Sequence, residues 1–290
     1  MPEELKEQIF ENGWDALGST PISEAEIQKR RQAVANAVAS FALEGFFQTE
    51  EQMNWNECFI NGKMSREKWL RDNHHDNYNN LAIRKAADLG INPIKGKFDV
   101  AHLKALHGYI FQDNPKIQAG KFRASARGDW HKERKLKSLN GFISLAVYSP
   151  MDEVSKEKLL NLLKNIVPSS LSELPRERFV KGLAYLYMHL DYIHPFQDGN
   201  SRTLRAFMQQ ISNEAGYVLD WEEFTQNPLA REQLYTARDL SVNKIAISNG
   251  NFRDPRIQTR ALETMMELED AEVQDLEDFF ENWISRRAKG

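Results

Sequence analysis

Residues 194–205 have the sequence HPFQDGNSRTLR, and the fold expected for this chain follows from them. It combines an imidazole, a carboxylate, a short polar turn and two arginines three positions apart. Pro195 fixes its own φ and disfavours the α region for the residue before it. A helix that precedes Pro195 is therefore expected to end at about His194, with the imidazole at its exit.

The segments on both sides of this stretch have helical periodicity. Upstream, residues 176–193 contain no proline and place apolar side chains at helical spacings, which predicts a buried helix. Downstream, residues 202–215 carry an apolar stripe, and Gly216 stands where a C-terminal cap is expected. The loop 196–201 leads into the second helix. A helix start presents unpaired N–H groups and the positive end of a dipole, so a phosphate is expected there.

The charged residues of the stretch favour a polyphosphate ligand. Cations in the first turn of a helix oppose its dipole by about 0.3–1 kcal/mol each, so an anion is expected near Arg202 and Arg205. Their spacing places both guanidiniums on one face. Asp198 offers the hard oxygen that Mg²⁺ needs when it bridges phosphates. His194, with an ordinary pKa of about 6.5, can take a proton from an attacking hydroxyl. A helix cap and an ordinary turn would each explain one of these residues, but not all of them together.

The stretch resembles the signature of the Fic family, His-x-Phe-x-Asp/Glu-Gly-Asn-Gly-Arg-x-x-Arg. The resemblance implies a mostly α fold, a Fic helical core with a short β-hairpin flap. It also implies an enzyme that transfers AMP from Mg-ATP to a Ser, Thr or Tyr hydroxyl of a target protein. By this resemblance His194 is the catalytic base and Asp198 the metal ligand. The implied nucleotide-binding residues are Phe196, which also serves as a packing anchor, Gly199, Asn200, Ser201, Arg202 and Arg205.

Ser201 departs from that signature, which has a second glycine at this position. A serine adds a Cβ and a hydroxyl to a nest that phosphate should approach closely. The related Doc branch carries lysine here and transfers the terminal phosphate. Three functions therefore stay open. AMP transfer is placed first, transfer of another group such as phosphate or UMP is second, and a nucleotide-binding or protein-binding module with weak turnover is third.

A second motif lies far upstream, at Ser40-Phe41-Ala42-Leu43-Glu44-Gly45. It resembles the Ser/Thr-x-x-x-Glu-Gly/Asn inhibitory motif of antitoxin partners of Fic proteins, which also occurs within Fic proteins. The resemblance implies an inhibitory site made of Ser40, Glu44 and Gly45, in which Glu44 pairs with Arg205 and keeps it from the terminal phosphate. The alternative is an ordinary helix end at Gly45.

The helix that would carry this motif has its own start signal. Ser23 and Glu26 have the spacing of a capping box, which predicts a helix from Glu24 to Glu44. The family resemblance then divides the chain into an inhibitory helical region at residues 1–70, a Fic core at 71–222 and a helical extension at 223–290.

Strand signals are few. The best are residues 120–130, with a turn at Gly128-Asp129, and residues 141–148, which are ambiguous. The resemblance places the flap at Lys121–Leu136 and implies that the target protein docks there. The basic residues that follow Trp130 form either a solvated face or a contact for an acidic target. Residues 260–287 predict one amphipathic helix, with Leu262, Met266, Val273, Leu276, Phe280 and Ile284 facing inward, that covers the core or forms a homodimer contact.

Composition narrows the remaining partners. A formal net charge of −4 argues against a broad nucleic-acid surface. Cys58 is the single cysteine, so a reducing compartment is expected. Neither a signal peptide nor an apolar run long enough to span a bilayer is evident. We therefore expect a protein in the bacterial cytoplasm that has no membrane partner. Specialised delivery into a host cell stays open.

Overall fold

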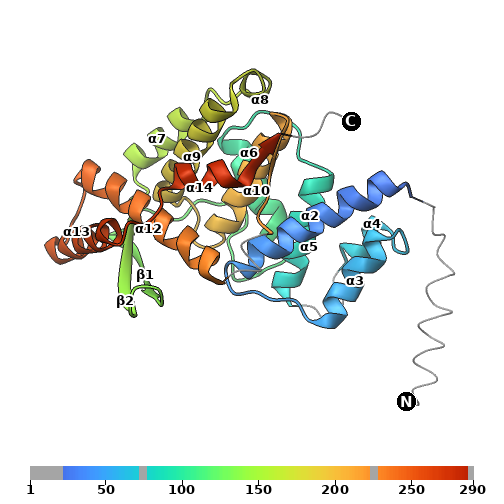
Figure 1. Cartoon of the computed structure of the whole chain (residues 1–290), viewed down its shortest axis with the longest axis horizontal. Helices are drawn as coiled ribbons and strands as arrows, with labels where there is room; N and C mark the ends of the chain where they lie inside the picture. The colour runs from blue at the N-terminus through green and yellow to red at the C-terminus, as the bar shows by residue number, and fades with distance from the viewer. Residues whose placement is uncertain (1–21, 72–76, 223–227, 287–290) are drawn as a thin grey trace, which may run out of the picture. The chain divides into compact units, whose positions relative to one another are not determined.

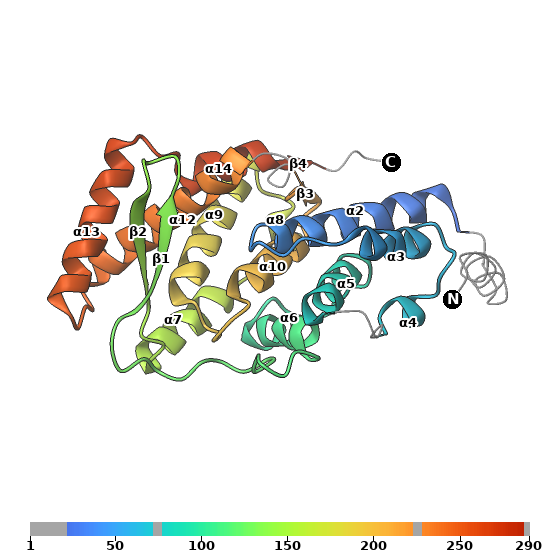
Figure 2. The same ribbon diagram turned by 90° about the horizontal axis from the view of Figure 1, so that it is seen from below.

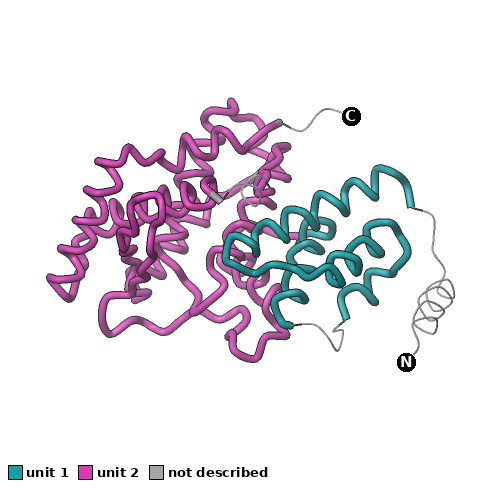
Figure 3. The backbone as a smooth tube through the Cα atoms, turned by 60° about the horizontal axis from the view of Figure 1, so that its bottom comes forward, with its two compact units in different colours: residues 1–93 teal, residues 94–290 magenta. Residues whose placement is uncertain are grey.

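The structure is a computed structural model that describes residues 22–71, 77–222 and 228–286 (Figure 1). Its contacts divide the chain into two compact units, residues 1–93 and 94–290 (Figure 3). This division follows packing alone. The three functional segments expected at residues 1–70, 71–222 and 223–290 therefore stay predictions.

The first unit is helical. Ser23 caps its first helix by accepting a hydrogen bond from the N–H of Glu26, as the spacing of these residues predicts. That helix ends at Ala42, slightly before the predicted end at Glu44. The described helices of this unit are α2 (Glu24–Ala42), α3 (Glu50–Ile60), α4 (Arg66–Trp69) and α5 (Tyr78–Ile91).

Within this unit α2 packs along α5 and against α3 (Figures 1 and 2). The approach to α5 is close, since a Cβ on Gly90 would lie 3.1 Å from Cβ of Ala33. On the other side, Arg30 of α2 donates to the carbonyl oxygen of Phe59 at 2.8 Å, and the Phe59 ring stacks on Trp69. The helix that carries the upstream motif is thus held from two directions.

The second unit is built around one buried helix, α9, which contacts α7, α10, α12, α14 and β2. All six apolar side chains that the periodicity of residues 176–193 places inward are buried: Phe179, Leu183, Leu186, Tyr187, Leu190 and Ile193. The helices of this unit are α6 (Val100–Phe111), α7 (Glu153–Leu163), α8 (Pro168–Leu171), α9 (Arg176–Ile193), α10 (Asn200–Glu214), α12 (Pro228–Asn249), α13 (Pro255–Asp270) and α14 (Leu276–Trp283). Its strands are β1 (Trp130–Leu136), β2 (Phe142–Tyr148), β3 (Tyr217–Leu219) and β4 (Ile284–Arg286).

A β-hairpin of β1 and β2 confirms the expected mostly α fold with one flap, although its first strand lies further along the chain than predicted. Trp130 pairs with Tyr148, and Leu136 pairs with Phe142. The predicted strand at residues 120–130 is wrong, because the amides of Arg123 and Ala126 donate to the carbonyls of Pro195 and Pro150 instead of to a strand. The basic run that follows is itself β1.

The prediction of one continuous helix at residues 260–287 is also wrong. Helix α13 ends at Asp270, Glu272 adopts a positive φ of 50°, and the carboxylate of Asp275 caps a new helix, α14. Beyond it, β4 pairs with β3 in a second small sheet. Met266, expected to face inward, is 59% exposed. Helix α14 does pack on α9, so this part of the tail covers the core as expected.

No helix among these described residues is both long enough and apolar enough to span a bilayer.

Candidate active site

His194 lies at the exit of α9, as the proline after it predicts. Its backbone is left-handed, with φ 48° and ψ 59°, while its N–H still donates to the carbonyl of Leu190. A positive φ is uncommon for a residue other than glycine, so other contacts must hold this turn. The side chain is 1% exposed, and its ring lies 4.0 Å from the ring of Tyr148 on β2.

Arg123 supplies those contacts. Its Nε donates to the carbonyl of His194 at 2.7 Å, and its Nη2 donates to the carbonyls of Ser149 at 2.6 Å and Ile193 at 3.3 Å. Its own amide donates to the carbonyl of Pro195. Burial lowers the pKa of Arg123 to about 10, so the guanidinium stays charged at neutral pH. One buried cation thereby fixes the backbone on both sides of the imidazole.

The buried imidazole of His194 has a polar neighbour at one of its two nitrogens. Its Nδ1 lies 3.3 Å from the carbonyl oxygen of Asp191 and 3.6 Å from Oδ1 of that residue. Its Nε2 has no hydrogen-bond partner among the described residues. Burial lowers the pKa of His194 to about 4, despite the opposing effect of Asp191. The ring is therefore neutral at pH 7, and a proton on Nδ1 leaves the lone pair on Nε2.

The loop after His194 rests on a second buried imidazole. The ring of His107 stacks on Phe196 with centroids 3.8 Å apart. Its Nδ1 accepts from the N–H of Gly120 at 2.8 Å, so Nε2 carries the proton that is donated to the carbonyl of Asp198 at 3.0 Å. Burial lowers the pKa of His107 to about 4. Sequence analysis missed His107, because nothing in its neighbours indicates a contact with a loop so far along the chain.

Two loop residues give the turn its shape. The side chain of Asn200 accepts from the N–H of Phe196 at 2.8 Å and donates to its carbonyl at 2.7 Å, so both of its polar groups bind the loop itself. Gly199 has a positive φ of 76°. A Cβ at Gly199 would lie 2.4 Å from the ring of Phe111, so only glycine fits.

The arginines stand at the start of α10. This helix begins at Asn200 rather than at the predicted position 202, and Gly199 offers no side-chain cap to its first amides. Arg202 pairs with Asp198 at 3.1 Å, and its guanidinium lies 4.7 Å from the ring centroid of Phe111. Arg205 is completely buried on the same helix. The structure thus brings an exposed carboxylate, a helix start and the two arginines to one place.

Asp198 fits the expected magnesium ligand. Its side chain is 61% exposed, and its Oδ1 accepts from the N–H of Gly199 and from Arg202. The described residues contain no group of three or more His, Cys, Asp or Glu side chains that could hold a metal on their own. A lone carboxylate suits Mg²⁺, which takes its other ligands from phosphates and water. Asp198 would hold such an ion.

Ser201 is the residue that departs from the Fic signature. Its Oγ accepts a hydrogen bond from Nη2 of Arg238 on α12 at 3.1 Å. Arg238 is in turn bonded to Asp191, the residue beside the His194 ring. Sequence analysis missed both of these partners, since Arg238 belongs to the extension expected at residues 223–290.

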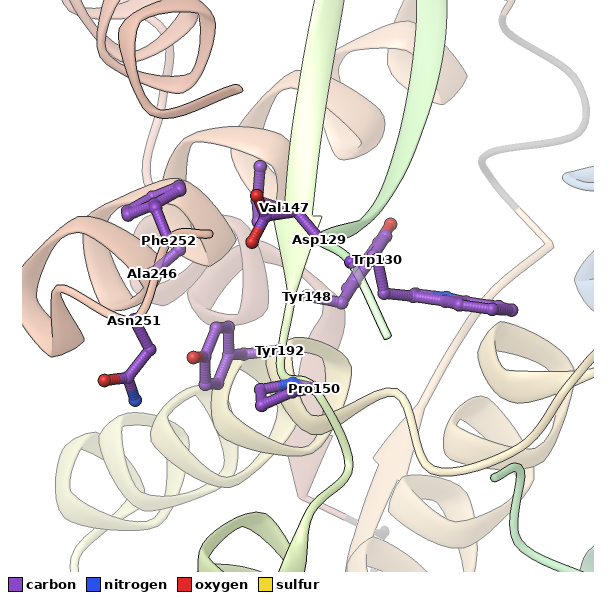
Figure 4. A pocket seen from close by; sticks show the side chains of 10 residues that line it. Asp129, Trp130, Val147, Tyr148, Pro150, Tyr192, Ala246, Asn251 and Phe252 are labelled. Carbon is purple, nitrogen blue, oxygen red and sulfur yellow. The ribbon is translucent and has the colours of Figure 1, made fainter. Parts of the chain in front are cut away.

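A small pocket at the foot of the hairpin is lined by Trp130, Tyr148 and Tyr192, among others (Figure 4). Its free volume of about 10 Å³ is roughly that of one water, so a nucleotide cannot bind in it. The carboxylate of Asp129 accepts from the N–H groups of Arg253 and Asp254, which ties the foot of β1 to the α12–α13 loop. The end of the hairpin that lies next to His194 is therefore held in place by these hydrogen bonds.

The upstream motif, described within its own unit, lies at the end of α2. Ser40 is buried, Glu44 is half-buried, and Gly45 has a positive φ of 85°. The N–H of Gly45 donates to the carbonyl of Ala42, and that of Phe46 donates to Phe41, which closes the helix end. The motif is thus a glycine-terminated helix end, a geometry with which both interpretations of it agree.

A helical core with one hairpin, in which a His-to-Arg loop joins two buried helices, is the arrangement that the Fic resemblance implies. Residues 97–212 match the model of the Fic/DOC family, and the chain contains a domain of this family.

Comparisons with individual proteins agree with this assignment. The chain is 27% identical over 172 residues to the protein adenylyltransferase VbhT of Bartonella schoenbuchensis, a match that covers 55% of this chain and 31% of that protein. It is 32% identical over 125 residues to the probable protein adenylyltransferase y4lH of Sinorhizobium fredii, covering 43% and 58%. The chain thus spans less than two thirds of either relative.

A crystal structure of a Fic-domain-containing signaling protein from Bacteroides thetaiotaomicron is similar in fold. It has a TM-score of 0.50 and 15% identity, over 95% of this chain and 93% of that one.

Proposed function

We propose that the chain is a protein adenylyltransferase, which transfers AMP from ATP to a Ser, Thr or Tyr hydroxyl of a target protein. The observation that carries the proposal is the neutral, buried imidazole of His194. Its Nε2 has no hydrogen-bond partner in the described structure, and the residue stands where α9 ends and the loop that leads into α10 begins. The curated relatives named as adenylyltransferases support the same reaction.

The proposed reaction is a substitution at the α-phosphorus. Nε2 of His194 takes the proton of the target hydroxyl as its oxygen bonds to the α-phosphorus of ATP. The bond from that phosphorus to the bridging oxygen breaks, and pyrophosphate leaves. Because the folded ring is neutral above about pH 4, the base is in its reactive form at neutral pH.

The loop and α10 supply the polyphosphate site of this proposal. The first amides of α10, the dipole of that helix and the guanidiniums of Arg202 and Arg205 would hold the phosphates. A Mg²⁺ ion held by Asp198 would neutralise charge that develops on the phosphates. Asn200 and Phe196 shape the loop, since the side chain of Asn200 is bonded to the backbone of Phe196 on both of its polar atoms.

Separate labels on ATP test the reaction. The full chain should incorporate label from α-labelled ATP and none from γ-labelled ATP, and intact mass should rise by one AMP residue. His194→Ala should abolish incorporation. His189→Ala is a matched control, because His189 is half-buried on the same helix and its ring contacts Tyr185 instead of the loop. Undiminished labelling of His194→Ala would remove His194 from the mechanism.

The same experiment separates the other reactions. Label from the γ-phosphate would identify phosphate transfer, and label from UTP in place of ATP would identify UMP transfer. ATP binding without any incorporation would favour a binding module.

We propose further that Glu44 restrains this activity by pairing with Arg205. The support is the sequence motif together with its place at the end of α2, where Ser40 and Glu44 stand one helical turn apart. Glu44→Gly should raise the incorporation of α-label, and Glu44→Gln should raise it as well, since charge is what the pairing needs. If neither variant gains activity while both remain folded, Glu44 is not inhibitory.

The target protein is proposed to dock on the flap. In the described part of the chain β1 pairs with β2 alone, so one edge of β1 can accept a strand of the target. Lys135→Glu should reduce labelling of acidic proteins in a bacterial lysate. Lys164→Glu, at the end of α7, is the control. Equal labelling by the two variants would contradict docking at this edge.

A further inference from the structure

A buried ionic network lies behind His194 and connects three helices. Asp191 stands one turn before His194 on α9 and accepts two hydrogen bonds from Arg238 of α12, Nε to Oδ2 and Nη2 to Oδ1, each at 2.9 Å. The side chains of Asp191 and Arg238 are 1% and 3% exposed. Nη2 of Arg238 also donates to Oγ of Ser201 on α10 at 3.1 Å. The contacts thus run from Ser201 through Arg238 and Asp191 to Nδ1 of His194.

We propose that Asp191, Arg238 and Ser201 are positioning residues, which hold the His194 ring with its proton on Nδ1 and its Nε2 lone pair toward the attacking hydroxyl. This inference rests on the proposed AMP transfer for its kinetic consequence. The tautomer itself can be observed without any turnover.

Asp191 is charged in this network and acts directly on the ring. Although burial opposes the charge, Arg238 and His194 hold the pKa of Asp191 well below its usual range. Nδ1 lies 3.3 Å from the backbone carbonyl of Asp191, which can only accept, and the charge of a carboxylate oxygen 3.6 Å away further favours the proton on that nitrogen. It also stabilises the imidazolium that forms when Nε2 takes the proton of the hydroxyl.

Arg238 makes this buried carboxylate tolerable. A lone buried carboxylate is strongly unfavourable, whereas a bidentate guanidinium satisfies both of its oxygens. Since Nη2 serves both Asp191 and Ser201, the serine hydroxyl fixes the plane of the guanidinium from the far side. Nη1 of Arg238 has no hydrogen-bond partner among the described residues, so no second anchor of that kind is seen.

The position of Ser201 in this network explains why a serine is suited to this chain. A glycine there, as the Fic signature has, would remove the acceptor for Arg238. We therefore infer that the serine at position 201 accompanies the arginine at position 238, because the serine hydroxyl accepts a hydrogen bond from that arginine on α12.

Other charged or titratable groups also face the ring. Tyr148 of β2 contacts it, Lys132 of β1 lowers the pKa of His194, and Arg238 lowers it further, while Asp191 raises it. Asp191 is thus the one group among these that favours a proton on the ring. Replacing Asp191 should therefore lower the pKa of His194 further, because burial, Lys132 and Arg238 all oppose protonation.

Nitrogen-detected NMR of the full chain with labelled histidine tests the tautomer. The wild-type protein should show His194 with Nδ1 protonated. Asp191→Asn keeps the backbone carbonyl beside Nδ1 but removes the charge, so it should lower the share of rings with the proton on Nδ1. It should also lower kcat, by less than the roughly 10⁴-fold loss seen when a directly bonded triad carboxylate becomes an amide. The KM for ATP should change by less than about threefold, since none of the three residues binds phosphate through its side chain in this scheme.

Ser201 provides a test that keeps the ion pair. Ser201→Ala should lower kcat roughly tenfold, the effect of one hydrogen bond to a charged group, and Ser201→Thr should restore most of it. Asp239→Asn is the matched control. Asp239 is also buried on α12 and bonded to an arginine, Arg134, at 2.7 Å, so its loss should leave the His194 tautomer unchanged.

The possible outcomes separate this inference from the proposed function. An unchanged tautomer and unchanged kcat in Asp191→Asn and Ser201→Ala would overturn it. If no variant transfers any group, the proposed function fails, and the His194 tautomer in the Asp191→Asn protein still shows whether Asp191 positions the ring. If Asp191→Asn fails to fold, the Ser201 pair of variants gives the decision, and equal kcat in Ser201→Ala and Ser201→Thr would overturn the inference.

Discussion

Gly199→Ala should destabilise the protein strongly, because the added methyl group has no room. Its Cβ would lie 2.4 Å and 2.7 Å from two ring carbons of Phe111, which is only 1% exposed. A non-glycine residue at a positive φ costs about 1–2 kcal/mol, and overpacking a core costs about 1–3 kcal/mol. The sum is about 2–5 kcal/mol. For a unit of this size, at about 2–4 °C per kcal/mol, that corresponds to a fall in Tm of roughly 4–20 °C.

Chemical denaturation and a thermal scan in parallel measure this effect. Gly182→Ala is the matched control, since nothing lies within 4 Å of a Cβ at that position of α9, and alanine there should stabilise the helix by about 0.5–1 kcal/mol. Adding Phe111→Leu to Gly199→Ala should recover part of the loss. The displaced ring also carries the guanidinium of Arg202, so ATP affinity should fall with stability.

A Gly199→Ala protein within about 1 kcal/mol of the wild type would refute the reasoning. It would mean that Phe111 can move aside at little cost, and that the loop is not fixed by the ring beneath it.

Three further results are expected. The free energy of unfolding should fall as pH drops from 6.5 to 4, by about 1–3 kcal/mol for each of His107 and His194. In the unfolded chain each imidazole binds a proton near pH 6.5, whereas in the folded protein it does so only near pH 4. A flat urea-denaturation profile over this range would contradict this expectation. Arg123→Lys should destabilise the protein by about 1–3 kcal/mol, because hydrogen bonds to buried carbonyls are lost. Arg127→Lys, at an exposed site, is the control and should leave stability unchanged. Calorimetry measures the stability of both variants, and equal stability would contradict the role given to Arg123. Chelation of Mg²⁺ should stop label transfer. It should leave Tm unchanged, since the described residues hold no cluster of metal ligands. A fall in Tm on chelation would instead indicate a structural ion.

The centre of the fold could be predicted because its signals are local. The periodicity of residues 176–193 and the proline that follows them fix both the face that α9 buries and its last residue, and the structure agrees on both. Helix α10 begins two positions before its predicted start at residue 202, since Asn200 bonds to the loop and also begins the helix. The roles of the loop residues stay predictions.

What the sequence could not indicate depends on contacts between distant segments. His107 and Arg123 lie beneath the loop only because α6 and the segment before the hairpin pack there, and Arg238 reaches Asp191 from α12. None of them has a neighbour in sequence that marks it. The sequence also predicts the position of strand β1 wrongly, for a related reason. Its side chains are mostly charged and exposed, so the pairing with the apolar β2 defines it, and its own composition does not.

The pairing of Arg238 with Asp191 also limits how the reactive loop can be moved between proteins. The segment that matches the family ends at residue 212, whereas the residue that neutralises Asp191 stands at position 238. A fragment cut at the family boundary, or a graft of this segment into another scaffold, would leave a buried negative charge without its counter-ion. Whoever transplants the histidine of this chain has to transplant α12 with it.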